Sequence, residues 1–369
     1  MLRIRSIALL VAIVADDLTG ALDVSAPFAR LGLKVQIAVS LAGLPYALQA
    51  GAEVVCVTTA SRELPAGAAA QRMAEAASKL AEARPAIVFN KIDSRLKGHV
   101  RLGIQTCLKA FGRRDVVVAP GVPAQGRLVR NGLIVGSGVL APIDIASRVD
   151  GIESLSIPDS ATNEDMERIA RRIDSSTTLF VGASGLGAGL ARALTDGAAA
   201  PFLQPSAPML FAIGSHDPVT HAQVDSLTAL AGCDLVRTTD GAFASDLPWR
   251  RITLVRAMSQ PDHPEHGSRL ARFGRSIAEQ LRRDRFESVL LCGGETAQTV
   301  LDDLGITTLL LRGEAASGIP LFEAQLRGRS LTILTKSGGF GTPDDLLRLA
   351  EVAHPVAPDI SSKSAGIYQ

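Results

Sequence analysis

Short apolar runs alternate with longer amphipathic segments through most of this chain, and this alternation limits the fold more than any other feature. Apolar runs at 53–58, 86–89 and 115–119 are separated by helical patterns at 66–83 and 100–111. Strands that alternate with helices in this way predict βαβ units and a parallel sheet covered by helices. Because ligands bind at the carboxyl ends of the strands in such sheets, we look for the site there.

A segment at 195–208 that is rich in alanine, proline and glycine interrupts the alternation. The 369 residues also exceed the usual size of one domain, for which about 150 residues is a working prior. A stretch without periodicity and of this composition is typical of a domain boundary. We therefore expect an α/β protein of two doubly wound domains with mainly parallel sheets, at 1–205 and 206–369, and an active-site cleft between them. A second interruption at 128–157 contains Asn131-Gly132, which favours a β-hairpin.

Composition restricts the classes of partner. The formal net charge is +1, which gives no electrostatic footprint for nucleic acid. No apolar run reaches the roughly 18 residues that a membrane-spanning helix needs. The four cysteines are scattered and form no C-x-x-C pair, which is typical of buried thiols in a reducing compartment. We expect a cytoplasmic protein that binds small molecules, with neither nucleic acid nor membrane as a partner, and we leave a homodimer open.

Two adjacent carboxylates, Asp16 and Asp17, follow the apolar run at 7–14 and precede a helical pattern that starts near Ala21. Both cannot be buried and charged without partners, because isolated buried charge is costly. At least one is therefore expected to face a cation, a hydrogen-bond donor or a substrate. Either aspartate could instead cap the helix that follows, since Asp is a preferred N-cap residue.

Other polar residues follow the later strands of the first domain: Arg62, Lys91, Asp93, Ser94, Arg95 and Arg127. Arginine binds carboxylates in a fork geometry, and lysine binds them as a point charge. Aspartate accepts hydrogen bonds from hydroxyls and can serve as a general base. If these side chains converge, they suit a small hydroxylated acid; taken singly, each could be a surface ion pair.

The second domain has two glycine-rich loops between an apolar strand and a helix, at 293–296 and at 337–341. Loops of this kind expose backbone N–H groups at a helix N-terminus and can hold phosphate, with Lys336 as an added charge. The alternative is that the glycines only make tight turns. No Gly-Lys dipeptide occurs, which excludes a Walker A loop, and the glycines at 185–189 do not complete a dinucleotide fingerprint.

The motifs, taken in order, resemble those of the four-carbon acid sugar kinase family. They are ADDLTGA at 15–21, SR at 61–62, KIDSRLKG at 91–98, PAQGR at 123–127, GASGL at 182–186, GS at 214–215, GGET at 293–296 and TKSGGFG at 335–341. Each is modest alone, but the ordered set is specific and covers nearly the whole chain. The resemblance implies an ATP-dependent kinase that phosphorylates the terminal C4 hydroxyl of threonate, erythronate or a 3-oxo-tetronate.

The resemblance also implies a division of labour, with the acid on the N-terminal domain and the nucleotide on the C-terminal domain. Together with the reasoning above, it assigns to the acid Asp16, Asp17, Arg62, Lys91, Ile92, Asp93, Ser94 and Arg127. It assigns to ATP Ser215, Gly293, Gly294, Glu295, Thr296, Lys336, Gly338 and Gly339.

The mechanism expected from these assignments is in-line phosphoryl transfer. Arg62 and Lys91 would anchor the acid, Asp17 would orient the attacking hydroxyl and accept its proton, and the glycine loops would hold the triphosphate with Mg²⁺. Closure of the two domains would exclude water. The sequence leaves open the protein ligands of Mg²⁺ and two other classes of function: a sensor that binds the same ligands without turnover, and an oxidoreductase that acts on a sugar acid.

Overall fold

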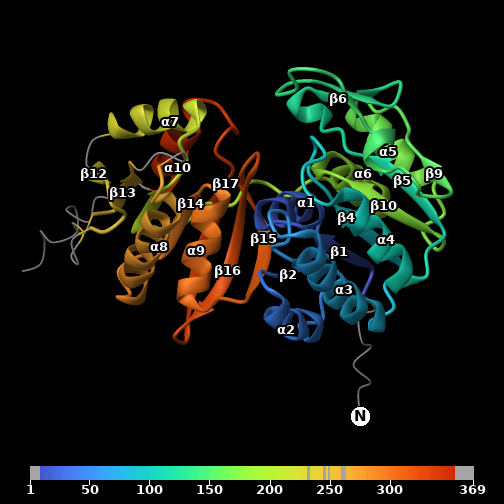
Figure 1. Ribbon diagram of the computed structural model, residues 1–369. Helices are drawn as coiled ribbons and strands as arrows, with labels where there is room; N and C mark the ends of the chain where they lie inside the picture. Colours follow the sequence, from blue (N-terminus) through green and yellow to red (C-terminus); the bar gives the residue numbers. More distant parts are fainter. Residues whose placement is uncertain (1–8, 231–232, 244–246, 248–249, 259–262, 354–369) are drawn as a thin grey trace, which may run out of the picture.

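The computed structural model describes residues 9–230, 233–243, 247, 250–258 and 263–353. Its two halves lie side by side, and one mixed sheet runs through both of them (Figure 1). The strand order is β12-β13-β11-β14-β17-β16-β15-β2-β3-β1-β4-β10-β5-β9. This arrangement confirms the α/β class, the two domains and the mainly parallel pairing.

The N-terminal half contains a parallel sheet with helices on both faces. Its strands are β1 (Val11–Ala15), β2 (Val35–Ala38), β3 (Val54–Thr58), β4 (Ile87–Lys91), β5 (Asp115–Ala119), β9 (Leu155–Ser156) and β10 (Thr178–Gly182). Its α-helices are α1 (Leu18–Arg30), α2 (Leu44–Gln49), α3 (Ala66–Glu82), α4 (Val100–Phe111), α5 (Asn163–Arg172) and α6 (Ser184–Leu194). Alternate residues of β1 belong to two different hydrophobic clusters, with α1, α5 and α6 on one side and α2, α3 and α4 on the other.

The C-terminal half repeats this layering. Its strands are β11 (Met209–Ile213), β12 (Cys233–Thr238), β13 (Ile252–Ala257), β14 (Ser288–Cys292), β15 (Thr308–Ala316), β16 (Ile319–Leu326) and β17 (Arg329–Lys336). Its helices are α7 (Pro218–Thr228), α8 (His266–Arg282), α9 (Gly294–Leu304) and α10 (Asp345–Ala353). Helices α8 and α9 pack together on one face, and α7 and α10 pack together on the other.

The junction between the halves is a pair of hydrogen-bonded strands. Strand β15 runs antiparallel to β2, with Thr308 opposite Ala38 and Leu311 opposite Val35. One hydrophobic cluster also continues from the core under α1 into the core under α8 and α9. The sequence predicted two separate sheets and did not predict β15 or β16. The hairpin formed by β15 and β16 supplies the strands that join them.

The segment at 128–157 contains the predicted hairpin. Strand β6 (Arg127–Arg130) pairs antiparallel with β7 (Leu133–Gly136), which pairs in turn with β8 (Ile143–Asp144). Asn131 and Gly132 both have positive φ, 49° and 74°, as expected of a two-residue hairpin turn. This small sheet stands beside the main one at the edge of the N-terminal half (Figure 1).

The residues between α6 and β11 form no helix or strand, and this segment contains the boundary predicted at 205/206. It is nevertheless attached to both halves. Ala200 N donates to Arg30 O at 2.7 Å, and Leu203 N donates to Glu314 O at 2.8 Å. The Arg30 guanidinium also lies 4.8 Å from the ring centroid of Phe202. The connection therefore follows the surfaces of α1 and β15.

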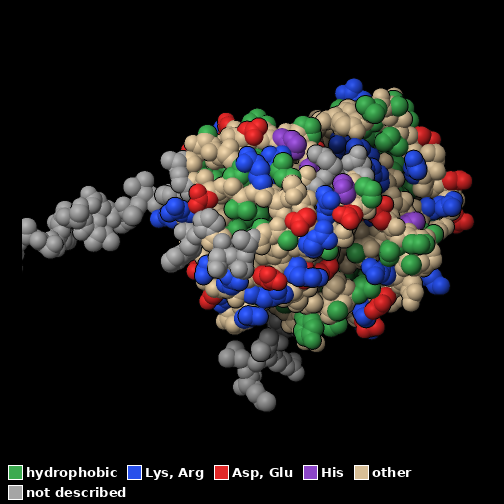
Figure 2. All heavy atoms as spheres, turned by 60° about the vertical axis from the view of Figure 1, so that its left-hand side comes forward, with side chains coloured by type: hydrophobic (Ala, Val, Ile, Leu, Met, Phe, Trp, Pro, Cys, Tyr) green, Lys and Arg blue, Asp and Glu red, His purple; other side chains and the backbone are tan. Residues whose placement is uncertain are grey.

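The molecular surface has no large region of one charge on the face seen in Figure 2, where acidic and basic side chains are interspersed. Among the residues that the structure describes, no helix is both long and apolar enough to cross a membrane.

Candidate active site

A cavity of about 940 Å³ lies between the two halves at the carboxyl ends of their strands. The N-terminal half lines it mainly with charged side chains, among them Asp17, Arg62, Lys91, Asp93 and Arg127. The C-terminal half lines it mainly with residues of three loops, which follow β11, β14 and β17. The predicted inter-domain cleft is therefore present, and its two walls are chemically different.

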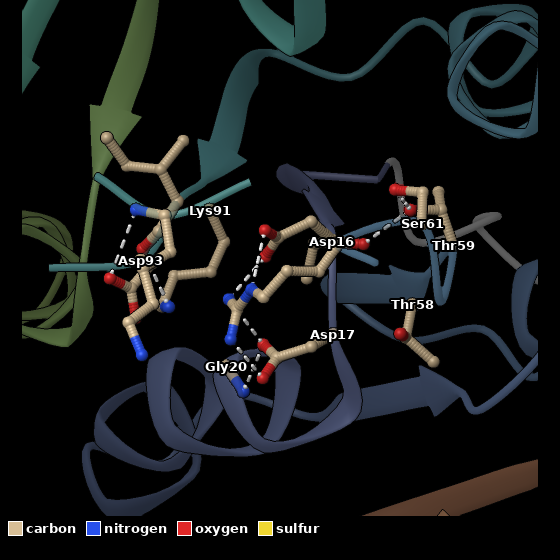
Figure 3. A network of polar contacts seen from close by, with 12 residues as sticks. Asp16, Asp17, Gly20, Thr58, Thr59, Ser61, Lys91 and Asp93 are labelled. Atoms are coloured by element: carbon tan, nitrogen blue, oxygen red, sulfur yellow. Dashed lines mark hydrogen bonds and ion pairs between the residues drawn. The ribbon is translucent and has the colours of Figure 1, made fainter. Parts of the chain in front are cut away.

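Asp17 and Arg62, which line the N-terminal wall, form an ion-paired cluster with Asp16 (Figure 3). Arg62 Nε and Nη2 donate to the two oxygens of Asp16 at 2.9 and 2.7 Å. Arg62 Nη1 and Nη2 donate to the two oxygens of Asp17 at 2.6 and 2.9 Å. Burial opposes the charged form of Arg62, but its hydrogen bond to Asp16 and the charges of both aspartates raise its pKa above the ordinary value.

The two aspartates of this cluster divide the roles that the sequence left open. Asp17 Oδ1 accepts a hydrogen bond from Gly20 N at 2.9 Å, so Asp17 is the N-cap of α1. The helix accordingly begins at Leu18, three residues before the predicted start. Asp16 is 8% exposed and does not line the cavity. The carboxylate of Asp16 holds the Arg62 guanidinium on the side away from the cavity and is not placed to touch a ligand.

Arg62 is not presented to the cavity as a free fork, contrary to the expectation that it anchors the acid. Four of its N–H contacts go to the two aspartates. The loop that carries Arg62 is also bound to the main chain of Asp16, because Ser61 N donates to Asp16 O at 2.9 Å. Buried Thr59 and Ser61 are joined through their hydroxyls at 2.7 Å (Figure 3). In this structure Arg62 joins the carboxylate of Asp17 to that of Asp16.

Lys91 reaches the same region from the end of β4. Its ammonium donates to Ile92 O at 2.9 Å, and a Cβ added to Gly20 would lie 2.7 Å from Lys91 Nζ. Only glycine at position 20 therefore leaves space for this ammonium over the first turn of α1. The Ile92 side chain is 4% exposed and belongs to the core, so its predicted contact with substrate is not supported beyond its main chain.

The outer part of the N-terminal wall contains Asp93, Ser94, Arg95 and Arg127, all of which line the cavity. Arg127 Nη1 donates to Ser94 Oγ at 2.6 Å, and Arg127 Nε donates to Ser137 O at 3.0 Å, which ties the hairpin sheet to this wall. Burial opposes ionisation of Asp93, but hydrogen bonds from the main chain of Arg95 and Lys97 and the charge of Arg62 lower its pKa. Arg127 thus lies near both the carboxylate of Asp93 and the positive charge of Arg95.

The C-terminal wall consists of three loops packed so closely that glycine is required at their contacts. A Cβ on Gly214 would collide with Thr296 Oγ1, and one on Gly338 would collide with Ser215 Oγ. Main-chain hydrogen bonds join the loops, from Gly214 N to Cys292 O and from Gly293 N to Lys336 O, both at 3.0 Å. The wall therefore presents main chain and small hydroxyls, as the glycine pattern indicated.

Lys336 differs from its predicted position. The side chain is 2% exposed and does not line the cavity. Its ammonium donates to Ser337 O at 2.9 Å and to Gly338 O at 3.1 Å, and burial lowers its pKa. Lys336 therefore holds the carbonyls of the glycine loop and is not itself directed at the position expected for phosphate.

The two walls touch where the helices that flank the cavity begin. A Cβ added to Gly294, the first residue of α9, would collide with Thr19 Oγ1 in the first turn of α1. The N-termini of α1 and α9 therefore meet at the cavity. Each helix N-terminus carries a partial positive charge and unpaired N–H groups.

Of the residues predicted for the site, all but Asp16, Ile92 and Lys336 line the cavity: Asp17, Arg62, Lys91, Asp93, Ser94, Arg127, Ser215, Gly293, Gly294, Glu295, Thr296, Gly338 and Gly339. Lining shows position, and the individual roles remain predictions.

Sequence reasoning missed Thr19, Asp23, Arg30, Asp217 and Glu314, which also line the cavity. Three of them lie on α1 as polar residues in an otherwise buried helix. Thr19, Asp23 and Arg30 are four and seven residues apart, so their shared helix face could have been noticed in the sequence.

Comparisons with known proteins agree with the division of the cavity. A family model described as a sugar-binding N-terminal domain matches residues 11–142. A second model, described as a nucleotide-binding C-terminal domain, matches residues 250–346. The charged wall thus belongs to the sugar-binding part and most of the glycine-rich wall to the nucleotide-binding part, which implies ATP.

Several curated relatives are similar over most of their length. A D-threonate kinase of Bordetella bronchiseptica is 29% identical and covers 92% of this chain and 96% of its own. A 3-oxo-tetronate kinase of Methylobacterium radiotolerans is 28% identical, with 90% and 96% covered. A crystal structure of a Salmonella typhimurium protein, described as a putative tRNA synthase, has the same fold, with a TM-score of 0.76 at 17% identity over 94% of this chain and 99% of that one. The chain belongs to the four-carbon acid sugar kinase family and is a nucleotide-binding kinase of four-carbon acid sugars.

Proposed function

We propose that this kinase transfers the γ-phosphoryl group of ATP to the terminal C4 hydroxyl of a tetronate: threonate, erythronate or a 3-oxo-tetronate. The observation that carries the proposal is the meeting of two helix N-termini at Thr19 and Gly294 inside a cavity with a charged wall and a glycine-rich wall. Helix N-termini attract phosphate, and a developing charge between two of them is stabilised from both sides.

The acid is held by the outer part of the charged wall. Arg127 and Arg95 lie near one another, and Lys91 lies deeper in the cavity. Arg62 is already committed to Asp16 and Asp17. A tetronate whose carboxylate is bound by Arg95 and Arg127 would direct its C4 hydroxyl to Asp17 and Lys91, which line the same cavity. Asp17 Oδ2 accepts one hydrogen bond from the described residues and has a second lone pair for a substrate hydroxyl.

The triphosphate is held by the glycine-rich wall, with main-chain N–H groups at Gly293, Gly294, Gly338 and Gly339 and the hydroxyls of Ser215 and Thr296. These groups line the cavity. Backbone N–H groups at a helix N-terminus bind phosphate oxygens without added charge. Glu295, in the first turn of α9, has its Oε2 3.5 Å from His266 Nε2.

The residues present fit Mg²⁺ bound chiefly through phosphate. Asp217 lines the cavity, its Oδ1 caps α7 through Val219 N at 2.9 Å, and no described residue donates to its Oδ2. No group of three or more metal-binding side chains occurs among the described residues. One carboxylate together with phosphate oxygens is a usual donor set for Mg²⁺. Asp217 would hold the ion, and Mg²⁺ would neutralise charge on the phosphates.

An ADP-release assay on threonate, erythronate and their 3-oxo forms tests the proposal, followed by NMR of the product to locate the phosphate. We expect ADP to form with at least one of these acids, and phosphorus coupling to the C4 protons. Binding without ADP would instead indicate a sensor, and turnover that needs a nicotinamide cofactor would indicate an oxidoreductase. Phosphate on another carbon would overturn the C4 assignment alone.

A further inference from the structure

Helix α1 turns one narrow stripe of residues toward the cavity. Within this helix only Thr19, Asp23, Pro27 and Arg30 are not buried, and all four line the cavity. Their spacing of four, four and three residues places them on one face of the helix. Thr19 is the residue that meets Gly294 at the start of α9. Asp23 therefore lies one turn from the point where the two helix N-termini meet.

The two carboxylates that α1 brings to the cavity differ in their partners. Asp17 accepts hydrogen bonds from Gly20 N and from two nitrogens of Arg62. No residue that the structure describes donates a hydrogen bond to the Asp23 carboxylate. The hydrogen bonds of Asp17 therefore hold its carboxylate in one position. The Asp23 carboxylate, which also lines the cavity, is open to a hydrogen bond from a ligand.

The surroundings of Asp23 favour the uptake of a proton. Burial is the main cause that raises its pKa to about 7, and the negative charges of Asp17 and Glu314 act in the same direction. Lys91, at the end of β4, opposes them. A general base is most effective when its pKa is close to the working pH. Among the described groups, Asp23 thus combines a position in the cavity with a suitable proton affinity.

We propose that Asp23, and not Asp17, accepts the proton of the attacking hydroxyl. This inference rests on the proposed function and changes its division of roles, since Asp17 then orients the hydroxyl without taking its proton. The substrate oxygen forms a bond to the γ-phosphorus while the bond from that phosphorus to the β,γ-bridging oxygen breaks, and ADP leaves with the electron pair. The hydroxyl proton passes to the Asp23 carboxylate, which later releases it to solvent.

Single-turnover phosphorylation of a tetronate by the wild type, Asp23→Asn and Asp17→Asn, measured from about pH 5 to 9, tests this assignment. The wild type should lose rate as pH falls through about 7. Asp23→Asn should be slower by roughly 10²–10⁴-fold and should lack this acidic limb, while its affinity for ATP in calorimetry stays within about twofold. Asp17→Asn should keep the acidic limb despite weaker substrate binding.

Two further variants separate proton transfer from a merely structural role. Asp23→Glu retains a carboxylate and should recover part of the rate lost in Asp23→Asn. Asp225→Asn removes an exposed helical aspartate on α7 and should match the wild type.

Three results would overturn the assignment. One is an Asp23→Asn enzyme within about tenfold of wild type. Another is retention of the acidic limb in that variant, and the third is a change confined to KM. Absence of turnover by the wild type with every tetronate would overturn the proposed function itself, and the role of Asp23 with it.

Discussion

The two walls of the cavity are held in place by different kinds of contact. On the N-terminal wall, charged side chains fix one another: Arg62 joins Asp16 to Asp17, and Lys91 fits over Gly20. On the C-terminal wall, three loops are fixed by close contacts of their glycines, and Lys336, the last residue of β17, is buried beneath the surface. A substrate that carries several hydroxyls needs directional side chains, whereas phosphate is bound well by backbone N–H groups.

This difference predicts different consequences of mutation. Loss of a charge on the N-terminal wall leaves an opposite charge buried without its partner, so stability and activity fall together. A larger side chain on the C-terminal wall should displace the loops and weaken nucleotide binding, but it should leave no buried charge without a partner. Four measurements order these effects from the largest to the smallest.

Arg62→Ala should have the largest effect. It leaves two carboxylates, side chains 9% and 28% exposed, without their cation, and loss of one partner of a buried pair costs about 3–5 kcal/mol. We expect a lower unfolding midpoint in urea and activity reduced by at least about 100-fold. Arg62→Lys should recover only part of either, because lysine cannot contact both carboxylates as a fork. An Arg62→Ala protein of normal stability, altered only in KM for the acid, would restore Arg62 to the role of anchor.

Asp23→Asn should change how stability depends on pH. The folded-state pKa is about 7 against 3.8 in the unfolded chain, so in the wild type the native state binds the extra proton between these values. Wild-type stability therefore falls as pH rises from about 4 to 7. The free energy of unfolding of the variant should not fall in this way. At pH 8 it should exceed that of the wild type by at most about 4 kcal/mol, and by less because the side chain is partly exposed. Urea unfolding at pH 5 and pH 8 measures it; parallel curves for the two proteins would contradict the prediction.

Lys336→Met tests whether the buried ammonium supports the glycine loop. It removes two hydrogen bonds from a charged donor to the carbonyls of Ser337 and Gly338, at a cost of roughly 1.5–3 kcal/mol. We expect lower thermal stability together with weaker binding of both ATP and ADP. A selective loss of ATP affinity at unchanged stability would instead mean that Lys336 reaches the γ-phosphate.

Gly294→Ala should have the smallest effect of the four and should be reversible by a second substitution. The added methyl collides with Thr19 Oγ1, and we expect kcat to fall about tenfold, near 1.4 kcal/mol. Thr19→Ala removes the obstructing oxygen, so the double variant should regain most of the rate. Additive losses in a double-mutant cycle would show that the two helix N-termini are not in contact during catalysis.

Most of the residues that the sequence predicts for the site line the cavity, because strand ends and glycine loops are local features. It could not assign partners, since nothing in the spacing of Asp16, Asp17 and Arg62 indicates that the arginine is shared by both carboxylates. Sequence reasoning also missed β15 and β16, although glycines at 318 and 328 mark the turns that flank β16. Two register irregularities interrupt the regular pairing of β15 with β16, near Gly313 and Ala315. The position of Asp23 on one face of α1 could have been read from the helical spacing, but its burial and its neighbours Asp17, Lys91 and Glu314 could not.

The pairing of β15 with β2 affects how this chain can be divided. If the halves were expressed separately, each would expose a strand edge that is internal in the intact sheet, together with part of a shared hydrophobic core. Open edges of this kind pair readily with other chains. Each half alone should therefore aggregate or exchange strands between molecules, and the two halves should be obtained in soluble form only when they are produced together.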